Sequence, residues 1–168
     1  RLSPPYDLAF NARVAMTEVM AGKPKQMIAK LRRMASSDNN KEYLDQVYYA
    51  IGNIYLSQKD TLHAISAYEQ GNELGVRSGI EKGVLLLKLG DLYWQRNKFG
   101  DAKRCYDVAI GLLDKERKDY RQLSERLQVL EELVPYTDAV ELQDSLQQLA
   151  KMNEHNRNAA IDRVITAL

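Results

Sequence analysis

Few side chains of this chain are of a type that could do chemistry. His63 and His155 are its only histidines, and Cys105 is its only cysteine. Neither histidine belongs to a metal-binding pattern such as His-Glu-x-x-His, and Cys105 has no evident histidine to activate it. A single cysteine forms neither a disulfide nor a cysteine-rich metal site within the chain. We therefore expect no enzymatic activity, no catalytic or metal-binding residues and no cofactor, and we expect Cys105 to be a small buried or half-buried structural residue.

Charge and glycine patterns point to no nucleic acid or nucleotide. Residues 23–33 are the most basic segment, but helical spacing distributes their cations over an outer face, which favours a solvated surface. Lys plus Arg number 24 and Asp plus Glu number 23, so the net charge does not favour DNA, RNA or an acidic membrane as the partner. Gly75, Gly79 and Gly83 lack both the Gly-Lys-Ser/Thr ending and the preceding strand of a phosphate-binding loop.

Two segments of the chain repeat each other at an interval of 38 residues. In each segment a glycine is followed three residues later by a tyrosine, and then by an alanine and a second tyrosine four residues apart. The matching pairs are Gly52 with Gly90, Tyr55 with Tyr93, Ala64 with Ala102 and Tyr68 with Tyr106. Gly and Ala are small where two helices approach closely, whereas Tyr and Leu fill the space between helices at spacings of three and four residues.

This pattern resembles the tetratricopeptide repeat, a helix-turn-helix unit. The resemblance implies an all-α fold, a right-handed superhelix of antiparallel helix pairs, and we expect about nine helices in a single domain over residues 1–168. The clear repeats cover residues 41–76 and 79–114, and degenerate repeats cover residues 6–37 and 117–153. Residues 155–168 cap the stack or open a further helix. The four residues beyond the usual period of about 34 are expected to lengthen the joint around 75–80.

Turn signals place the helix ends. Residues 57–61 and 96–101 are polar breaks, with Asp60 and Asp101 placed to accept bonds from free N–H groups of the following helix. Before the first clear unit, Tyr6–Ala21 and the stretch from Met27 to Met34 read as two helices. Beyond Lys115, one helical stripe is expected to stop at Pro135, and the stripe from Ala139 to Leu149 is expected to form its partner.

In the repeat family the first helices of successive units line a concave wall that binds peptides. The resemblance assigns to this wall Gln46, Tyr49, Asn53, Leu56 and Ser57, and then Val84, Leu87, Asp91, Trp94 and Gln95. We select six of these as partner-binding residues: Gln46, Tyr49, Asn53, Leu87, Asp91 and Trp94. An Asn amide pairs with both groups of a peptide backbone, and Tyr and Trp supply broad contact area at low rotamer cost. Repeats that clamp chaperone C-termini carry Lys and Asn on one unit and Lys and Arg on the third. This chain keeps Asn53, but Tyr49 replaces the Lys, and the third unit offers Arg121 with Glu125 where Arg is wanted, so we do not expect a receptor for chaperone tails.

A narrower resemblance covers about residues 6–165. Residues 39–52, Asp60-Thr61 and Ala64-Ile65, and later residues 120–136 and 143–147, are similar to the repeat region of the PorW/SprE lipoproteins of type IX secretion and gliding machinery. This implies a periplasmic segment of an outer-membrane lipoprotein that contacts other secretion subunits; a cytoplasmic location stays an alternative. The chain begins at Arg1, has no apolar run that would span a bilayer and shows no signal sequence, so we expect any lipid anchor to lie upstream.

The sequence as a whole predicts a non-enzymatic scaffold that binds a protein or peptide on its concave face, with no nucleic-acid partner. The alternative from another class is a self-associating structural module, in which an edge helix such as His155–Leu168 pairs between copies or continues an array.

Overall fold

The computed structural model describes residues 23–166, and all regular structure in that range is helical. The elements are α2 (Pro24–Ala35), the short 3₁₀ helix η1 (Asp38–Tyr43), α3 (Leu44–Ser57), α4 (Thr61–Leu74), α5 (Ile80–Gln95), α6 (Phe99–Leu112), α7 (Tyr120–Lys151) and α8 (Glu154–Thr166). The all-α expectation is thus met in the described residues. The helix expected at Tyr6–Ala21 lies outside them.

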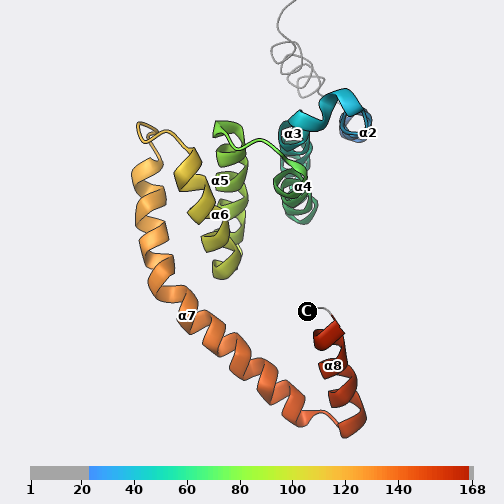
Figure 1. Cartoon of the computed structure of the whole chain (residues 1–168), viewed down its shortest axis with the longest axis vertical. Coiled ribbons are helices and arrows are strands. Elements are labelled where there is room, and N and C mark those ends of the chain that lie inside the picture. The colour runs from blue at the N-terminus through green and yellow to red at the C-terminus, as the bar shows by residue number, and fades with distance from the viewer. Residues whose placement is uncertain (1–22, 167–168) are drawn as a thin grey trace, which may run out of the picture.

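The helices stack in chain order. The pairs α3–α4 and α5–α6 pack as antiparallel hairpins, α2 packs against α3, α4 against α5, and α6 against α7 (Figure 1). Residues 75–79 form the non-helical joint between the two pairs, where the extra residues of the longer repeat were expected. Buried side chains form one cluster around α2 and α3 and a larger one across α4, α5, α6 and the first half of α7.

One glycine in each hairpin allows its two helices to pack closely. Gly52 lies against the ring of Tyr68, and Gly90 lies against the ring of Tyr106, so that each tyrosine of the second helix packs onto the backbone of the first. A Cβ atom at Gly90 would lie 2.6 Å from Cε1 of Tyr106, which no real structure accommodates without movement. The repeated Gly and Tyr positions of the sequence therefore mark one packing contact that occurs twice.

The hairpin turns also repeat. Lys59 and Asn97 have φ values of 61° and 58°, in the left-handed region, and they end α3 and α5. The next residue then bonds back to a carbonyl five positions earlier: Asp60 N donates to Tyr55 O and Lys98 N donates to Tyr93 O, each at 2.9 Å. This closure satisfies carbonyls at the helix end.

One of the two expected helix caps is present. The Asp60 carboxylate accepts a bond from the backbone N–H of His63 at 3.2 Å and caps α4, as predicted. The prediction for Asp101 is wrong, because α6 already begins at Phe99 and places Asp101 within its first turn. There its carboxylate lies 3.5 Å from Arg104 instead of capping the helix.

The two helices predicted between Leu123 and Leu149 are a single helix, so the break at Pro135 is wrong. α7 runs for 32 residues with Pro135 inside it, and Figure 1 shows that it changes direction in its middle. Matching the three units at intervals of 38 and then 37 residues shows why the helix does not end at Pro135. The residue that corresponds to Asn97 is Val134, whose β-branched side chain disfavours the left-handed region. The residue that corresponds to Lys98 is Pro135, which has no N–H to donate to the closing bond.

The third unit also lacks the packing contact of the first two. Leu127 stands where they have Gly52 and Gly90, so a second helix could not approach its backbone as closely. The described residues consequently hold seven α-helices, and the nine expected for the chain are not seen in that range. In residues 23–166 we find no helix with the length and hydropathy needed to cross a bilayer.

Candidate functional site

A small hollow lies between α5 and α7 and has a volume of about 130 Å³. Its walls are mainly polar, and they come from two elements that lie far apart in sequence. The lining residues are Leu87, Asp91, Trp94 and Gln95 from α5, and Asp119, Gln122, Leu123 and Arg126 from α7 and the residue before it. We call this hollow the α5–α7 pocket. It exists because α5 and α7 both pack against α6 while their own backbones stay apart.

Arg126 organises the floor of the α5–α7 pocket. Its Nη1 donates to Asp91 Oδ1 at 2.8 Å and to the Tyr106 hydroxyl at 3.1 Å. Its guanidinium also lies over the ring of Trp94, 5.2 Å from the ring centroid. Trp94 in turn meets Phe99 edge to face, with ring centroids 5.7 Å apart. The indole and the guanidinium are therefore held in place before any ligand arrives.

A second ion pair lies at the start of α7. Arg117 donates from Nε and Nη2 to the two carboxylate oxygens of Asp119, at 2.7 and 2.9 Å. This bidentate pair lowers the pKa of Asp119 and raises that of Arg117. Tyr49 of α3 lies near enough to contribute, as a smaller cause, to the raised pKa of Arg117. Side chains of α3, α5 and the start of α7 thus face the same side of the stack.

The structure brings together three of the six predicted binding residues. Leu87, Asp91 and Trp94 line the α5–α7 pocket. Gln46, Tyr49 and Asn53 lie half-buried on α3, outside that lining. The ring of Tyr49 packs against that of Tyr68, with centroids 5.7 Å apart. The partner-binding role of all six residues remains a prediction.

Asn53 and Asp91 hold corresponding positions and make corresponding bonds. The Tyr68 hydroxyl donates to Asn53 Oδ1 at 2.7 Å, and the Tyr106 hydroxyl donates to Asp91 Oδ1 at 2.5 Å. Burial raises the pKa of the Tyr106 phenol, and the bond to the Asp91 carboxylate raises it further. Part of the hydrogen-bonding capacity that we assigned to peptide recognition is therefore used within the hairpins.

Sequence reasoning missed Arg126, Asp119 and Gln122 as residues of this pocket. A signal for Arg126 was present, because it stands 37 residues after Leu89 and 75 after Ile51, both of which are buried apolar residues. An arginine at a repeat position that is otherwise apolar indicates that this position no longer faces a hairpin partner. Nothing in the local sequence marked Asp119 or Gln122.

The described side chains offer contact surface and few reactive groups. Cys105 is fully buried, as expected, and burial raises the pKa of its thiol to about 12. No group of three or more His, Cys, Asp and Glu side chains within residues 23–166 is placed to hold a metal ion. The α5–α7 pocket presents paired charges, amides and an indole face, an assortment that suits hydrogen bonding and stacking with a polypeptide.

Comparison with known proteins finds the repeat itself. The family model described as tetratricopeptide repeat matches residues 45–74, which span α3 and α4, and this supports a tetratricopeptide-repeat protein. Such repeats generally mediate protein–protein interaction and are typically non-catalytic. A search of curated proteins finds no match to the chain.

Proposed function

We propose that this chain is a non-catalytic scaffold that binds a peptide or a folded subunit on the face formed by α3, α5 and α7. The observation that carries the proposal is the α5–α7 pocket, where Trp94, Arg126 and Asp91 are held by one another and still line an open hollow. The six predicted residues are its proposed contacts. Affinity would come from contact area and preformed polar groups.

The proposal includes the finer architecture. Residues 1–168 form one repeat domain whose units stack as a right-handed superhelical solenoid, so that the first helices of successive units share a concave wall. Each unit buries its apolar face only against its neighbours, which makes stacking a condition of stability. The stacking of α2 to α7 in chain order supports this arrangement.

Binding at the α5–α7 pocket is tested by adding charge to the pocket without removing a packed side chain. Gln95 and Gln122 are exposed residues of the lining, and the double variant Gln95→Glu, Gln122→Glu places two more carboxylates beside Asp91 and Asp119. We expect recovery of a co-purifying partner from cell-envelope extracts, quantified by mass spectrometry, to fall at least tenfold. Trp94 is the only tryptophan, so its emission reports occupancy of the pocket directly.

The matched control carries the same chemical changes elsewhere. Gln26 on α2 and Gln70 on α4 are exposed and lie outside the pocket lining, so the variant Gln26→Glu, Gln70→Glu changes net charge equally. The α5–α7 pocket is not the binding surface if both double variants recover the partner to the same extent while remaining folded by circular dichroism.

We also propose that the scaffold belongs to a secretion or gliding apparatus of the cell envelope, as a periplasmic part of an outer-membrane lipoprotein. The support is the resemblance of residues 39–52 and 120–136 to the PorW/SprE lipoproteins. The test is fractionation of cells that produce the native protein. Recovery in the cytoplasmic fraction, without acylation, would contradict this location.

A self-associating structural module is the second candidate, and a specific observation favours it. α8 has no buried residue, and Ile161, Val164 and Ile165 are exposed on it. Light scattering coupled to size-exclusion chromatography distinguishes the candidates. A monomer at all concentrations rejects self-association, and a concentration-dependent dimer supports it.

A further inference from the structure

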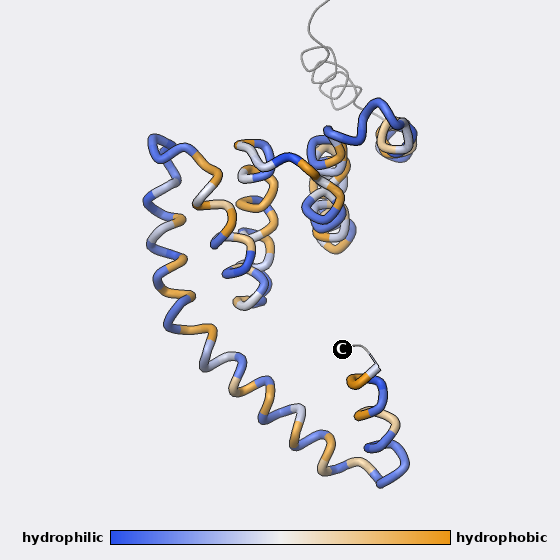
Figure 2. Tube along the Cα trace, in the orientation of Figure 1, coloured by the Kyte–Doolittle hydropathy of each residue, from blue (hydrophilic) through white to orange (hydrophobic). Residues whose placement is uncertain are grey.

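The second half of α7 leaves the stack of helices. Every residue from 138 to 148 is exposed, and beyond the bend the helix runs away from α5 and α6 toward α8 (Figure 2). Several large apolar side chains remain in solvent there, with Leu142 and Leu146 62% and 57% exposed on α7, and Val164 and Ile165 63% and 64% exposed on α8. A group of large exposed apolar side chains on a protein surface marks an interaction surface.

An apolar cleft lies between the two helices. It has a volume of about 370 Å³ and is formed by Ser145, Gln148, Leu149 and Met152 of α7 with Ala160, Ile161, Val164 and Ile165 of α8. We call it the α7–α8 cleft. Its walls are the apolar faces of two helices that diverge from a short turn, so the cleft is a groove open to a third helix.

The approach to this cleft along α7 is acidic. Residues 127–150 contain Glu131, Glu132, Asp138, Glu141 and Asp144 and have no Lys, Arg or His. Asp138 and Glu141 precede the cleft residues Ser145 and Gln148 at helical spacings of three and four, so they continue the line of side chains that enters the cleft. A ligand in the cleft would therefore meet apolar walls and, at the end nearer the bend, carboxylates that have no basic residue within four positions on α7. The nearest cation of α7 is Lys151, beside Met152 at the other end of the cleft.

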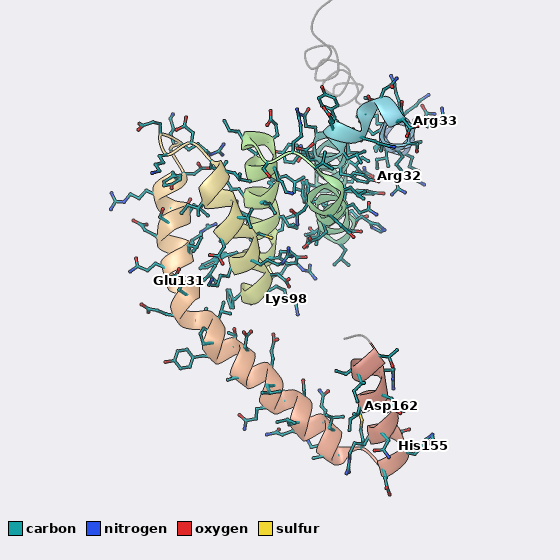
Figure 3. The ribbon with its side chains drawn as sticks, in the orientation of Figure 1. Arg32, Arg33, Lys98, Glu131, His155 and Asp162 are labelled. Atoms are coloured by element: carbon teal, nitrogen blue, oxygen red, sulfur yellow. The ribbon has the colours of Figure 1, made fainter. Side chains whose placement is uncertain are left out.

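We propose that the α7–α8 cleft binds one amphipathic helix of another protein, with an apolar face for the cleft and lysine or arginine beside it for Asp138 and Glu141. The described part of this chain offers no such helix to a second copy. α2 carries four cations and no acid, but its apolar residues Met27, Ile28 and Leu31 are buried. α8 balances Glu154 and Asp162 with Arg157 and Arg163. Figure 3 shows Arg32 and Arg33 of α2 at the opposite end of the chain from α8.

The test uses a synthetic probe and the whole chain. The probe is a fluorescein-labelled peptide of about 18 residues, built from Leu at helical spacings of three and four and Lys at the flanking positions. One control peptide replaces every Lys with Glu, and another keeps the composition but scrambles the Leu spacing. Fluorescence anisotropy should show saturable binding of the Lys peptide that weakens as salt increases, and at least tenfold weaker binding of both controls.

Variants then locate the binding. Leu146→Gln with Ile165→Gln replaces Ile165 of the cleft lining and Leu146, an exposed apolar residue next to the lining residue Ser145, and should weaken binding of the Lys peptide at least tenfold. Asp138→Asn with Glu141→Gln should weaken it about threefold or more and reduce its salt dependence. The matched control is Val108→Gln, because Val108 is a comparably exposed apolar residue on α6, and it should leave binding unchanged.

The remaining outcomes separate this cleft from the α5–α7 pocket and from self-association. Binding that survives Gln95→Glu with Gln122→Glu, and leaves Trp94 emission unchanged, supports the cleft. Equal affinity for the Glu peptide, or no effect of Leu146→Gln with Ile165→Gln, would overturn the proposal. So would a concentration-dependent dimer that Leu146→Gln with Ile165→Gln dissociates, because a second copy would then be the occupant.

Discussion

Gly90 shows how a single atom decides whether a hairpin of this protein can close. Its Cα position faces the ring of Tyr106, and Cβ of Cys105 would lie 3.3 Å from an added Cβ atom. Gly111, near the end of α6, has open space on the same test, with nothing within 4 Å. Both glycines lie inside helices, so replacing each with alanine separates the effect of close packing on stability from the effect of helix propensity.

We predict opposite effects for alanine at these two positions. Gly90→Ala should lower the free energy of unfolding by about 1–3 kcal/mol, because the buried ring must move. Gly111→Ala should raise it by about 0.5–1 kcal/mol, because alanine has less conformational freedom to lose in a helix. Urea unfolding followed by circular dichroism measures both. A stabilising Gly90→Ala would show that the hairpin has room to spare.

Asp45 is a buried acid at the start of α3. Only 2% of its surface is exposed, and its Oδ1 has no hydrogen-bond partner in the structure. Burial raises the pKa of this carboxyl, although the charge of Arg77 opposes that change. A raised pKa means that this group favours folding most at acid pH, below its unfolded value of about 3.9, and that the benefit is lost as pH rises through the folded pKa.

Asp45→Asn should therefore stabilise the protein at neutral pH. We expect a gain of about 1 kcal/mol at pH 7, because the amide has no charge to desolvate, and a smaller gain at pH 4, where the wild-type carboxyl takes up a proton. Urea unfolding of both proteins at the two pH values checks this. A gain that is equal or larger at pH 4 would mean that Arg77 holds Asp45 in its charged form.

At the scale of elements, α7 is one helix because its chain cannot make the turn that ends α3 and α5. Lys59 and Asn97 take up the left-handed conformation there, and Val134 stands at the corresponding position. Pro135 prevents the closing bond but also removes one bond of the helix and bends it. At the bend, the Thr137 hydroxyl donates to Val134 O at 2.9 Å.

Pro135→Ala should straighten α7. The alanine N–H can bond to the carbonyl of Glu131, and the proline ring no longer displaces the preceding turn, so helix formation becomes more favourable by up to about 3 kcal/mol. Small-angle X-ray scattering should show a larger radius of gyration, with Trp94 emission unchanged because the α5–α7 pocket precedes the bend. An unchanged radius would mean that packing, and not proline, sets the direction of the helix.

Across the whole molecule, stability should fall from the stacked hairpins toward the end of the described chain. α3 to α6 contribute most of the two buried clusters, whereas α8 buries no residue and packs only against α7. In an array of repeats, an element is stabilised by its own folding and by the neighbours it touches. The last helix touches one neighbour.

Hydrogen exchange measures this gradient. Amides of α5 should exchange at least 100-fold more slowly than amides of α8, because opening α5 disrupts the central cluster whereas opening α8 exposes little that is buried. The peptide probe for the α7–α8 cleft should slow exchange in α8 and leave α5 unchanged. Equal protection of both helices in the free protein would contradict the gradient.

The sequence by itself determined the helical class, the two clear hairpins and the burial of Cys105. These follow from local facts: spacings of three and four, paired small and aromatic positions, and an interval of 38 residues. Each such signal lies within one hairpin, where contacting residues are close in the chain and the same contact occurs twice.

Only the tertiary structure decided the third unit and the candidate site. The sequence predicted a break at Pro135 because proline usually ends a helix. The lost turn became evident only when the structure showed that Lys59 and Asn97 end the earlier helices in the left-handed conformation, because Val134 and Pro135 stand at the corresponding positions of the third unit. The α5–α7 pocket joins Asp91 to Arg126, 35 residues away, and such a pair is set by how helices stack. Side chains on different helices meet through packing, and no local pattern encodes that distance.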